Sequence, residues 1–100
     1  MKNRVYLLVC YDVETTSEGG KGRLRRMAKA CSAYGQRVQY SVFELQLTLP
    51  LLEKFLHRAT QIMDHEKDSL RVYSLGSDRD DYLKVYGRDG WLDFDEPLVI

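Results

Sequence analysis

A single carboxylate, Asp12, stands directly after an apolar run at residues 5–11 and has the best position in the chain for chemistry. A run this apolar predicts a central strand covered on both faces, whose end holds a charged side chain in a fixed place. A fixed carboxylate beside a phosphate is what a Mg²⁺ site needs, so Asp12 is the candidate metal ligand and catalytic residue. The competing interpretation is structural, because an acid at a strand end more often caps a turn.

One Asp12 per chain is too little for a catalytic metal site, and the end of the first strand offers no second acid. Two copies of the chain related by a twofold axis would solve this, because their Asp12 carboxylates would converge on one ion. Such a site, holding Mg²⁺ or another divalent cation, activates water for phosphodiester hydrolysis.

Tyr11 is a second candidate for the catalytic site, since its hydroxyl can position substrate or water. Side chains alternate along a strand, so Tyr11 and Asp12 share a face only if the strand has already ended. The alternative role for Tyr11 is a place in the core.

Positive charge concentrates in residues 1–40, where eight basic and three acidic residues give +5, while the rest of the chain carries −5. Apolar residues spaced as one helical face at 24–31 predict a helix ended by Gly35, with basic residues on its opposite side. This asymmetry indicates a face for a polyanion, although a solvated helix surface explains it equally well. The candidate phosphate contacts are Arg23, Arg25, Arg26, Lys29 and Arg37.

Hydrophobic periodicity predicts the remaining elements. Residues 37–47 alternate as a strand should, but the phase slips near 41–43, which predicts two strands joined by a kink or very short turn. Pro50 opens a second helix with one apolar face. A strand at 70–75, a short strand at 82–86 and a strand-like chain end then follow.

The resulting order, β-α-β-β-α-β with short C-terminal strands, predicts an α+β ferredoxin-like domain spanning residues 1–100. The apolar chain end needs a place to dock, and the candidates are a sheet edge of the same subunit or of a partner. Phe43 is expected in the core or at a dimer interface.

Composition limits the class of protein and the cellular compartment to which the chain can belong. The net charge of zero does not match a simple basic nucleic-acid binder, and no apolar run is long enough to span a membrane. Two cysteines without metal-ligand spacing, and no secretory segment, predict a reducing cytoplasm. His57 and His65 lie eight positions apart, which does not suit a shared metal, and we expect both to be solvated.

Several segments together resemble one family, the small CRISPR-associated adaptation subunit that is often described as an endoribonuclease. The most specific is Arg-Val-Gln-Tyr-Ser-Val-Phe-Glu at 37–44, immediately after the glycine-ended helix. The first strand ending Tyr-Asp-Val, the basic residues at 23–26 and the chain end at 95–100 complete the match. The first loop and residues 66–71 most resemble the type I-C variants.

The resemblance implies a homodimer whose terminal strands extend the neighbouring sheet and which sits between pairs of the integrase subunit during spacer insertion. It also implies a Mg²⁺-dependent nuclease for RNA or double-stranded DNA. Ser41 resembles a family position that shapes the site, although a polar residue filling a bulge is the alternative. Residues 85–100 are expected to dock on the partner, through the interface residues Pro97, Leu98 and Val99, together with Phe43.

Three functions remain open at this point. The first is the metal-dependent nuclease centred on Asp12. The second is an architectural subunit that binds DNA while the integrase performs the chemistry, so that cleavage is dispensable for adaptation. The third is a ferredoxin-like module that binds a small ligand or a protein and never contacts nucleic acid.

Overall fold

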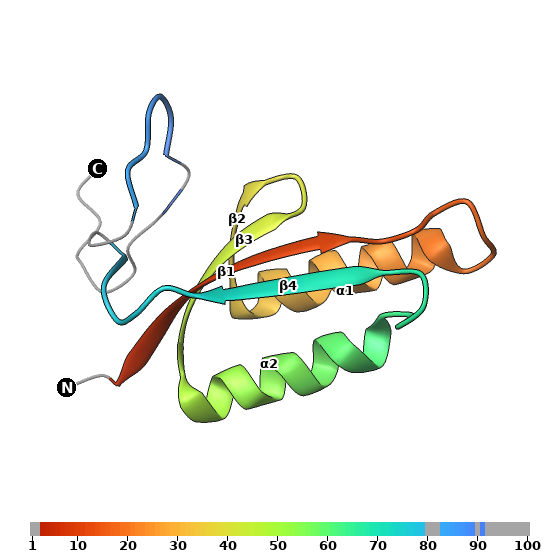
Figure 1. The fold of residues 1–100 in the computed structure, drawn as a ribbon, viewed down its shortest axis with the longest axis horizontal. Coiled ribbons are helices and arrows are strands. Elements are labelled where there is room, and N and C mark those ends of the chain that lie inside the picture. Colours follow the sequence, from red (N-terminus) through yellow and green to blue (C-terminus); the bar gives the residue numbers. More distant parts are fainter. Residues whose placement is uncertain (1–2, 80–82, 90, 92–100) are drawn as a thin grey trace.

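The computed structural model describes residues 3–79, 83–89 and 91 of the chain. Its elements, in chain order, are β1 Arg4–Asp12, α1 Gly20–Tyr34, β2 Gly35–Gln39, β3 Val42–Thr48, α2 Leu49–Ile62 and β4 Ser69–Ser74 (Figure 1). This order confirms the predicted α+β, ferredoxin-like β-α-β-β-α-β arrangement. Neither helix in these ranges is long and apolar enough to cross a membrane.

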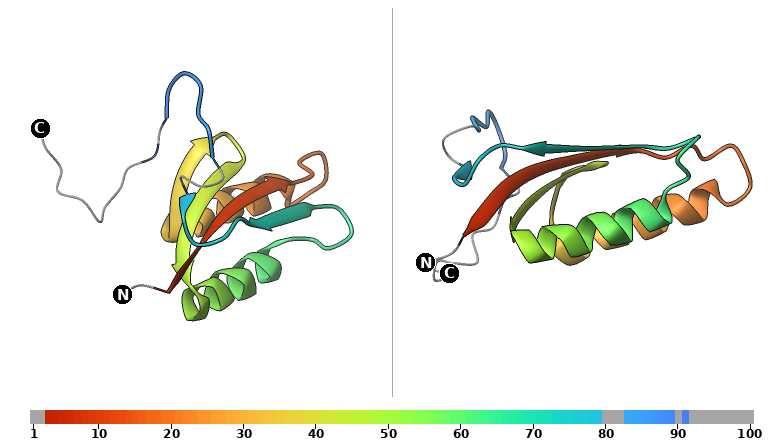
Figure 2. Two further views of the ribbon diagram at one scale, coloured as in Figure 1. Left: turned by 60° about the vertical axis from the view of Figure 1, so that its left-hand side comes forward. Right: turned by 60° about the horizontal axis from the view of Figure 1, so that its bottom comes forward.

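The four strands form one antiparallel sheet in the order β2-β3-β1-β4, which places β1 at the centre. Both helices lie on the same side of this sheet (Figure 2). We call the opposite side the open face. It carries alternate β1 residues, among them Leu8, Cys10 and Asp12, of which Asp12 is exposed and the other two are half-buried. The prediction that β1 is covered on both faces is therefore wrong at the end that carries Asp12, because an antiparallel sheet can leave one face to solvent.

The core lies between the sheet and the helices. Leu7, Val9 and Tyr11 point toward the helices from β1, and Phe55 meets them from α2. Cys31 of α1 is fully buried here, as its apolar position predicted, and burial raises the pKa of its thiol to about 12. The period-two pattern of the strand and the apolar stripes of the helices thus build one core.

The phase slip in residues 37–47 corresponds to two strands, as predicted. β2 and β3 are joined by only two residues, Tyr40 and Ser41. The irregularity itself lies earlier than predicted, because the pairing register shifts between Arg37 and Gln39. One extra residue in β2, Val38, is therefore accommodated as a bulge.

Residues 83–86 do not form the predicted strand. The segment 83–89 instead lies beside the open face, where it lines a cavity with Leu8 and Val42. The alternating pattern of this segment is too short to decide its structure without a neighbouring strand. The expected docking residues Pro97, Leu98 and Val99 lie outside the described residues, as does most of the 85–100 extension.

A buried carboxylate, Glu44, connects the other end of the open face to the segment after β4. Glu44 accepts hydrogen bonds from the Tyr6 hydroxyl and from Nε of Arg79, each at 2.5 Å. The Trp91 ring covers the Arg79 guanidinium, whose carbon lies 4.7 Å from the centre of the ring. Burial, then the hydrogen bond to Glu44, raise the pKa of Tyr6, so this phenol stays protonated. Half of the open face is thereby covered, while the half that carries Asp12 is not covered by any described segment.

Gly35, the first residue of β2, shows how closely the chain passes β3 directly after α1 ends. Its backbone is extended, so a left-handed conformation does not explain the glycine. A Cβ at this position would instead lie 2.5 Å from the Glu44 carbonyl oxygen and 2.6 Å from Cδ1 of Leu45. We therefore expect Gly35→Ala to lower the free energy of unfolding by about 1–3 kcal/mol, measured by urea denaturation.

Gly22→Ala is the matched control. A Cβ on Gly22, in the first turn of α1, would meet only the flexible guanidinium of Arg26 at 3.1 Å. Alanine is the better helix former, so the control should gain up to about 1 kcal/mol. Equal effects of the two substitutions would contradict the proposed close approach.

Candidate functional site

Asp12 is the last residue of β1 and lies on the open face, paired with Ser69 of β4. Its carboxylate is exposed and has no hydrogen-bond or ion-pair partner among the described residues. The turn after β1 is capped by Glu14, which accepts hydrogen bonds from the backbone N–H groups of Thr16 and Ser17 at 3.0 Å. Hydrogen bonds from the Ser17 and Thr16 hydroxyls are the main reason that the pKa of Glu14 falls to about 2. Asp12 is thus not the turn cap and is left available for a ligand.

Tyr11 does not share a face with Asp12. It is only 6% exposed and stacks on Phe43, with the ring centres 6.0 Å apart. The strand continues through Asp12, so alternation sends the two side chains to opposite sides of the sheet. The structure places both Tyr11 and Phe43 in the core of the chain and separates Tyr11 from the candidate metal ligand.

A cavity of about 300 Å³, here called the edge pocket, contains several of the predicted site residues. It lies beside α1 at the β2–β3 turn, and Arg37 NH₂ donates a 3.4 Å hydrogen bond to the Tyr11 hydroxyl at its wall. Its lining residues are Tyr11, Lys21, Leu24, Arg25, Ala28, Arg37, Tyr40 and Ser41. Ser41 and Tyr11 therefore line the same cavity, which lies on the helix side of the sheet.

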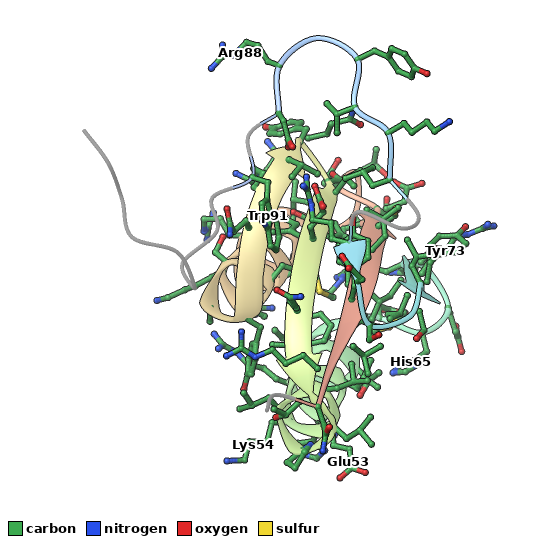
Figure 3. All side chains as sticks on the ribbon, turned by 90° about the vertical axis from the view of Figure 1, so that its left-hand side faces the viewer. Glu53, Lys54, His65, Tyr73, Arg88 and Trp91 are labelled. Atoms are coloured by element: carbon green, nitrogen blue, oxygen red, sulfur yellow. The ribbon has the colours of Figure 1, made fainter. Side chains whose placement is uncertain are left out.

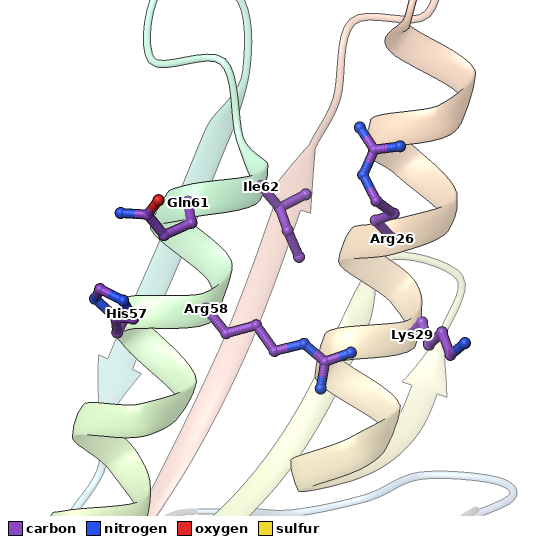
Figure 4. A pocket seen from close by; sticks show the side chains of 6 residues that line it. All are labelled: Arg26, Lys29, His57, Arg58, Gln61 and Ile62. Carbon is purple, nitrogen blue, oxygen red and sulfur yellow. The ribbon is translucent and has the colours of Figure 1, made fainter.

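A second basic surface, here called the helix groove, runs between α1 and α2. Figure 4 shows Arg58 reaching from α2 toward α1, where Arg26 and Lys29 project. The groove measures about 500 Å³ and its described lining includes no acidic side chain. His57 lies at its α2 side, exposed as predicted. The basic residues predicted on one side of this helix therefore belong to two different surfaces. Arg25 lines the edge pocket, whereas Arg26 and Lys29 line the helix groove.

Sequence reasoning did not find Arg58 or Lys21 as members of these surfaces. Their positions depend on how the helices pack against each other and against the β2–β3 turn. The one available signal was that Lys21 lies one helical turn before Arg25, on the same side of α1.

Arg23 has a structural role instead of the predicted phosphate contact. Its Nε lies 2.8 Å from Oδ2 of Asp68, and its side chain is only 12% exposed. The same carboxylate accepts backbone hydrogen bonds from Glu14 at 3.0 Å and from Asp64 at 2.8 Å. Arg23 and Asp68 therefore form a clip that joins the loop after β1, the start of α1 and the loop before β4.

The donor set around Asp12 limits what one chain can bind. No group of three His, Cys, Asp or Glu side chains in the described ranges could hold a metal ion. Asp12 supplies one hard oxygen ligand, and Ser69 across from it supplies a hydroxyl. Oxygen ligands of this kind suit Mg²⁺, but two of them are fewer than the ion needs. A single chain therefore does not fit the ion, whereas two Asp12 carboxylates would.

The family model of CRISPR associated protein Cas2 matches residues 5–82. The CRISPR-associated endoribonuclease Cas2 1 of Moorella thermoacetica is 45% identical over 96% of this chain and 100% of its own length. The CRISPR-associated endonuclease Cas2 of Halalkalibacterium halodurans is 44% identical over 93% of this chain and 97% of its own. The crystal structure of Streptococcus pyogenes Cas2 is 45% identical, with a TM-score of 0.71, over 82% of this chain and 99% of that chain. The type I-C subtype stays a prediction.

The Arg23–Asp68 clip makes a prediction about acid stability. The pKa of Asp68 falls from 3.8 to about 2, chiefly because Arg23 donates to it. Because the folded pKa lies below the unfolded one, the clip stabilises the protein fully above pH 4 and loses this contribution as the pH falls toward 2. Arg23→Gln should cost roughly 2–3 kcal/mol at pH 7, and this loss should shrink toward pH 2. Urea denaturation at several pH values measures it, with the exposed Arg25→Gln as the matched control. A pH-independent difference would contradict the clip.

Proposed function

The chain belongs to the CRISPR-associated Cas2 family, and from that membership we propose that it acts in CRISPR adaptation as a homodimeric, nucleic-acid-binding endonuclease that needs a divalent cation. The observation that carries the nuclease is Asp12, exposed and without a partner among the described residues on the open face. The adaptation role also includes the integrase subunit as a partner.

The open face is the surface through which we propose that two copies associate. Leu8, Cys10 and Val42 are half-buried there, and Tyr73 of β4 projects from the same face with 43% of its surface exposed (Figure 3). Apolar and aromatic groups of this kind are removed from water when a second sheet covers them. A twofold axis through this face brings the Asp12 carboxylates toward each other.

Paired Asp12 residues give the oxygen ligands that one chain lacks. A bound Mg²⁺ supplies Lewis-acid polarisation of the phosphate and a more acidic water. The chain itself contributes the negative charge that holds the ion, the fixed strand that positions Asp12, and the Ser69 hydroxyl beside it. Arg71 pairs with Cys10, two positions before Asp12 on the same face of the sheet, and adds positive charge near the substrate phosphate.

The helix groove is the surface that we propose for the backbone of a duplex. Arg26, Lys29 and Arg58 line it without an acidic neighbour in the described lining. It lies on the helix side of the sheet, so a dimer formed through the open faces leaves both grooves accessible. Contacts of this kind provide affinity without sequence preference, which suits a protein that handles varied DNA.

An architectural subunit without required cleavage is the second candidate. It is favoured by the separation of the helix groove from Asp12, because the two lie on opposite sides of the sheet. DNA could thus be held without engaging the proposed metal site.

The nuclease proposal predicts that Asp12→Asn reduces cleavage roughly 100-fold or more, because the cation loses charged ligands. The assay compares cutting of duplex DNA and single-stranded RNA, with and without Mg²⁺, on purified proteins confirmed as dimers. Glu53→Gln, an exposed carboxylate on α2, is the control and should cut like the wild type. Equal cutting by the wild type and Asp12→Asn, or none by either, would overturn the nuclease and leave the architectural function.

The groove proposal predicts a change in salt dependence. Replacing Arg26, Lys29 and Arg58 by Gln should reduce the slope of log K against log salt for duplex DNA by about 0.9 for each phosphate that the variant no longer neutralises. The control removes the same charge elsewhere, through Lys54→Gln, Lys84→Gln and Arg88→Gln, all exposed. This placement of the duplex is contradicted if the control variant reduces the slope as much as the groove variant does, or more.

A further inference from the structure

The edge pocket combines positive charge with an exposed tyrosine ring, whereas the described lining of the helix groove includes no tyrosine. Lys21 and Arg25 lie on one side, from α1, and Arg37 lies on the other, from β2. No acidic side chain belongs to its described lining. The pocket therefore attracts an anion, and its remaining walls decide which one.

Arg37 is held in position although it is exposed. Its guanidinium carbon lies 5.1 Å from the centre of the Phe43 ring and 5.7 Å from that of Tyr40, and NH₂ donates to the Tyr11 hydroxyl. Because Tyr11 and Phe43 belong to the rigid core, they fix the planar group without neutralising its charge. A guanidinium arranged this way is prepared for a phosphate, since little side-chain entropy remains to be lost on binding.

Tyr40 forms one wall of the pocket and is unusually exposed for so large a side chain. It occupies the two-residue turn between β2 and β3 and is 82% exposed. A large aromatic ring at this exposure gains little from folding, whereas it offers a flat surface on which a nucleobase can stack. Leu24 and Ala28 add an apolar wall from α1.

The size of the pocket selects among nucleic-acid ligands. About 300 Å³ is at the small end of ligand cavities and suits a single nucleotide. A base inside a duplex has both faces stacked on its neighbours and cannot lie on Tyr40, so the nucleotide must be unpaired.

We propose that the edge pocket binds one unpaired nucleotide of a single strand, with the base on Tyr40 and the phosphate among Lys21, Arg25 and Arg37. This inference rests on the proposed function as a nucleic-acid-binding protein. Tyr11 and Asp12 are consecutive in β1, so the pocket and the proposed metal site lie at the same end of the sheet, on opposite faces. The pocket distinguishes single-stranded from paired segments of a substrate.

The test measures binding of fluorescein-labelled eight-nucleotide oligo(dT), the matching oligo(U) and a blunt DNA duplex by fluorescence anisotropy. EDTA is present, so binding is separated from cleavage. Tyr40→Leu should weaken binding of both single strands roughly 5- to 100-fold, the range expected for removing one stacked base, and change duplex binding less than about twofold. Tyr40→Phe keeps the ring and should bind like the wild type.

Tyr86→Leu is the matched control, since Tyr86 is 88% exposed but lines a different cavity from the edge pocket. The proposal is overturned if Tyr40→Leu leaves single-strand binding unchanged, if it weakens duplex binding equally, or if Tyr86→Leu has the same effect. A second variant, Arg37→Gln, should reduce the salt slope for oligo(dT) by about 0.7, and an unchanged slope would also overturn the proposal.

Competition with thymidine 5′-monophosphate separates a free nucleotide from a strand. Displacement of oligo(dT) only at a large excess of thymidine monophosphate supports the proposal, whereas binding of the mononucleotide without any binding of oligo(dT) overturns it. Failure of the proposed nuclease is distinguishable, because Asp12→Asn abolishes no binding measured in EDTA.

Discussion

The alternation of side chains along β1 is the constraint on which the rest of the molecule depends. Leu7, Val9 and Tyr11 enter the core beneath the helices, so Leu8, Cys10 and Asp12 must face the other way. A slip of one residue would bury Asp12 and expose Tyr11. The same hydrophobic packing that stabilises the sheet therefore holds the Asp12 carboxylate at the surface and keeps the Tyr11 hydroxyl at the wall of the edge pocket.

Two other carboxylates, Glu44 within β3 and Asp68 just before β4, show why acidic residues of one sheet differ so much in role. Asp68 is surrounded by donors from Arg23 and two backbone N–H groups, and Glu44 by Tyr6 and Arg79. Both are committed to holding loops against the sheet. Asp12 has no such donors among the described residues, and this difference in surroundings, more than residue type, is what leaves its carboxylate available to a ligand.

Sequence patterns predicted the elements well and the site only in part. The β-α-β-β-α-β order, the break before β3 and the end of α1 at Gly35 follow from local periodicity and glycine placement. Local patterns could not show that Arg23 meets Asp68, 45 positions away, or that Arg58 approaches α1, because both depend on packing between distant segments. The hydrogen bond of Tyr11 could not be predicted for the same reason, since its partner Arg37 comes from another strand.

The placement of charge on separate surfaces bears on which function matters in the cell. The helix groove and the edge pocket both lie on the helix side of the sheet, while Asp12 lies on the open face. Their cations are spread over elements that the core already fixes, so binding does not depend on the metal site being assembled. A chain without Asp12 would keep all the cations of both proposed binding surfaces, because these lie on the opposite side of the sheet from the proposed metal site. Of the two proposed activities, holding nucleic acid is therefore the one that needs no second copy of the chain to complete its site.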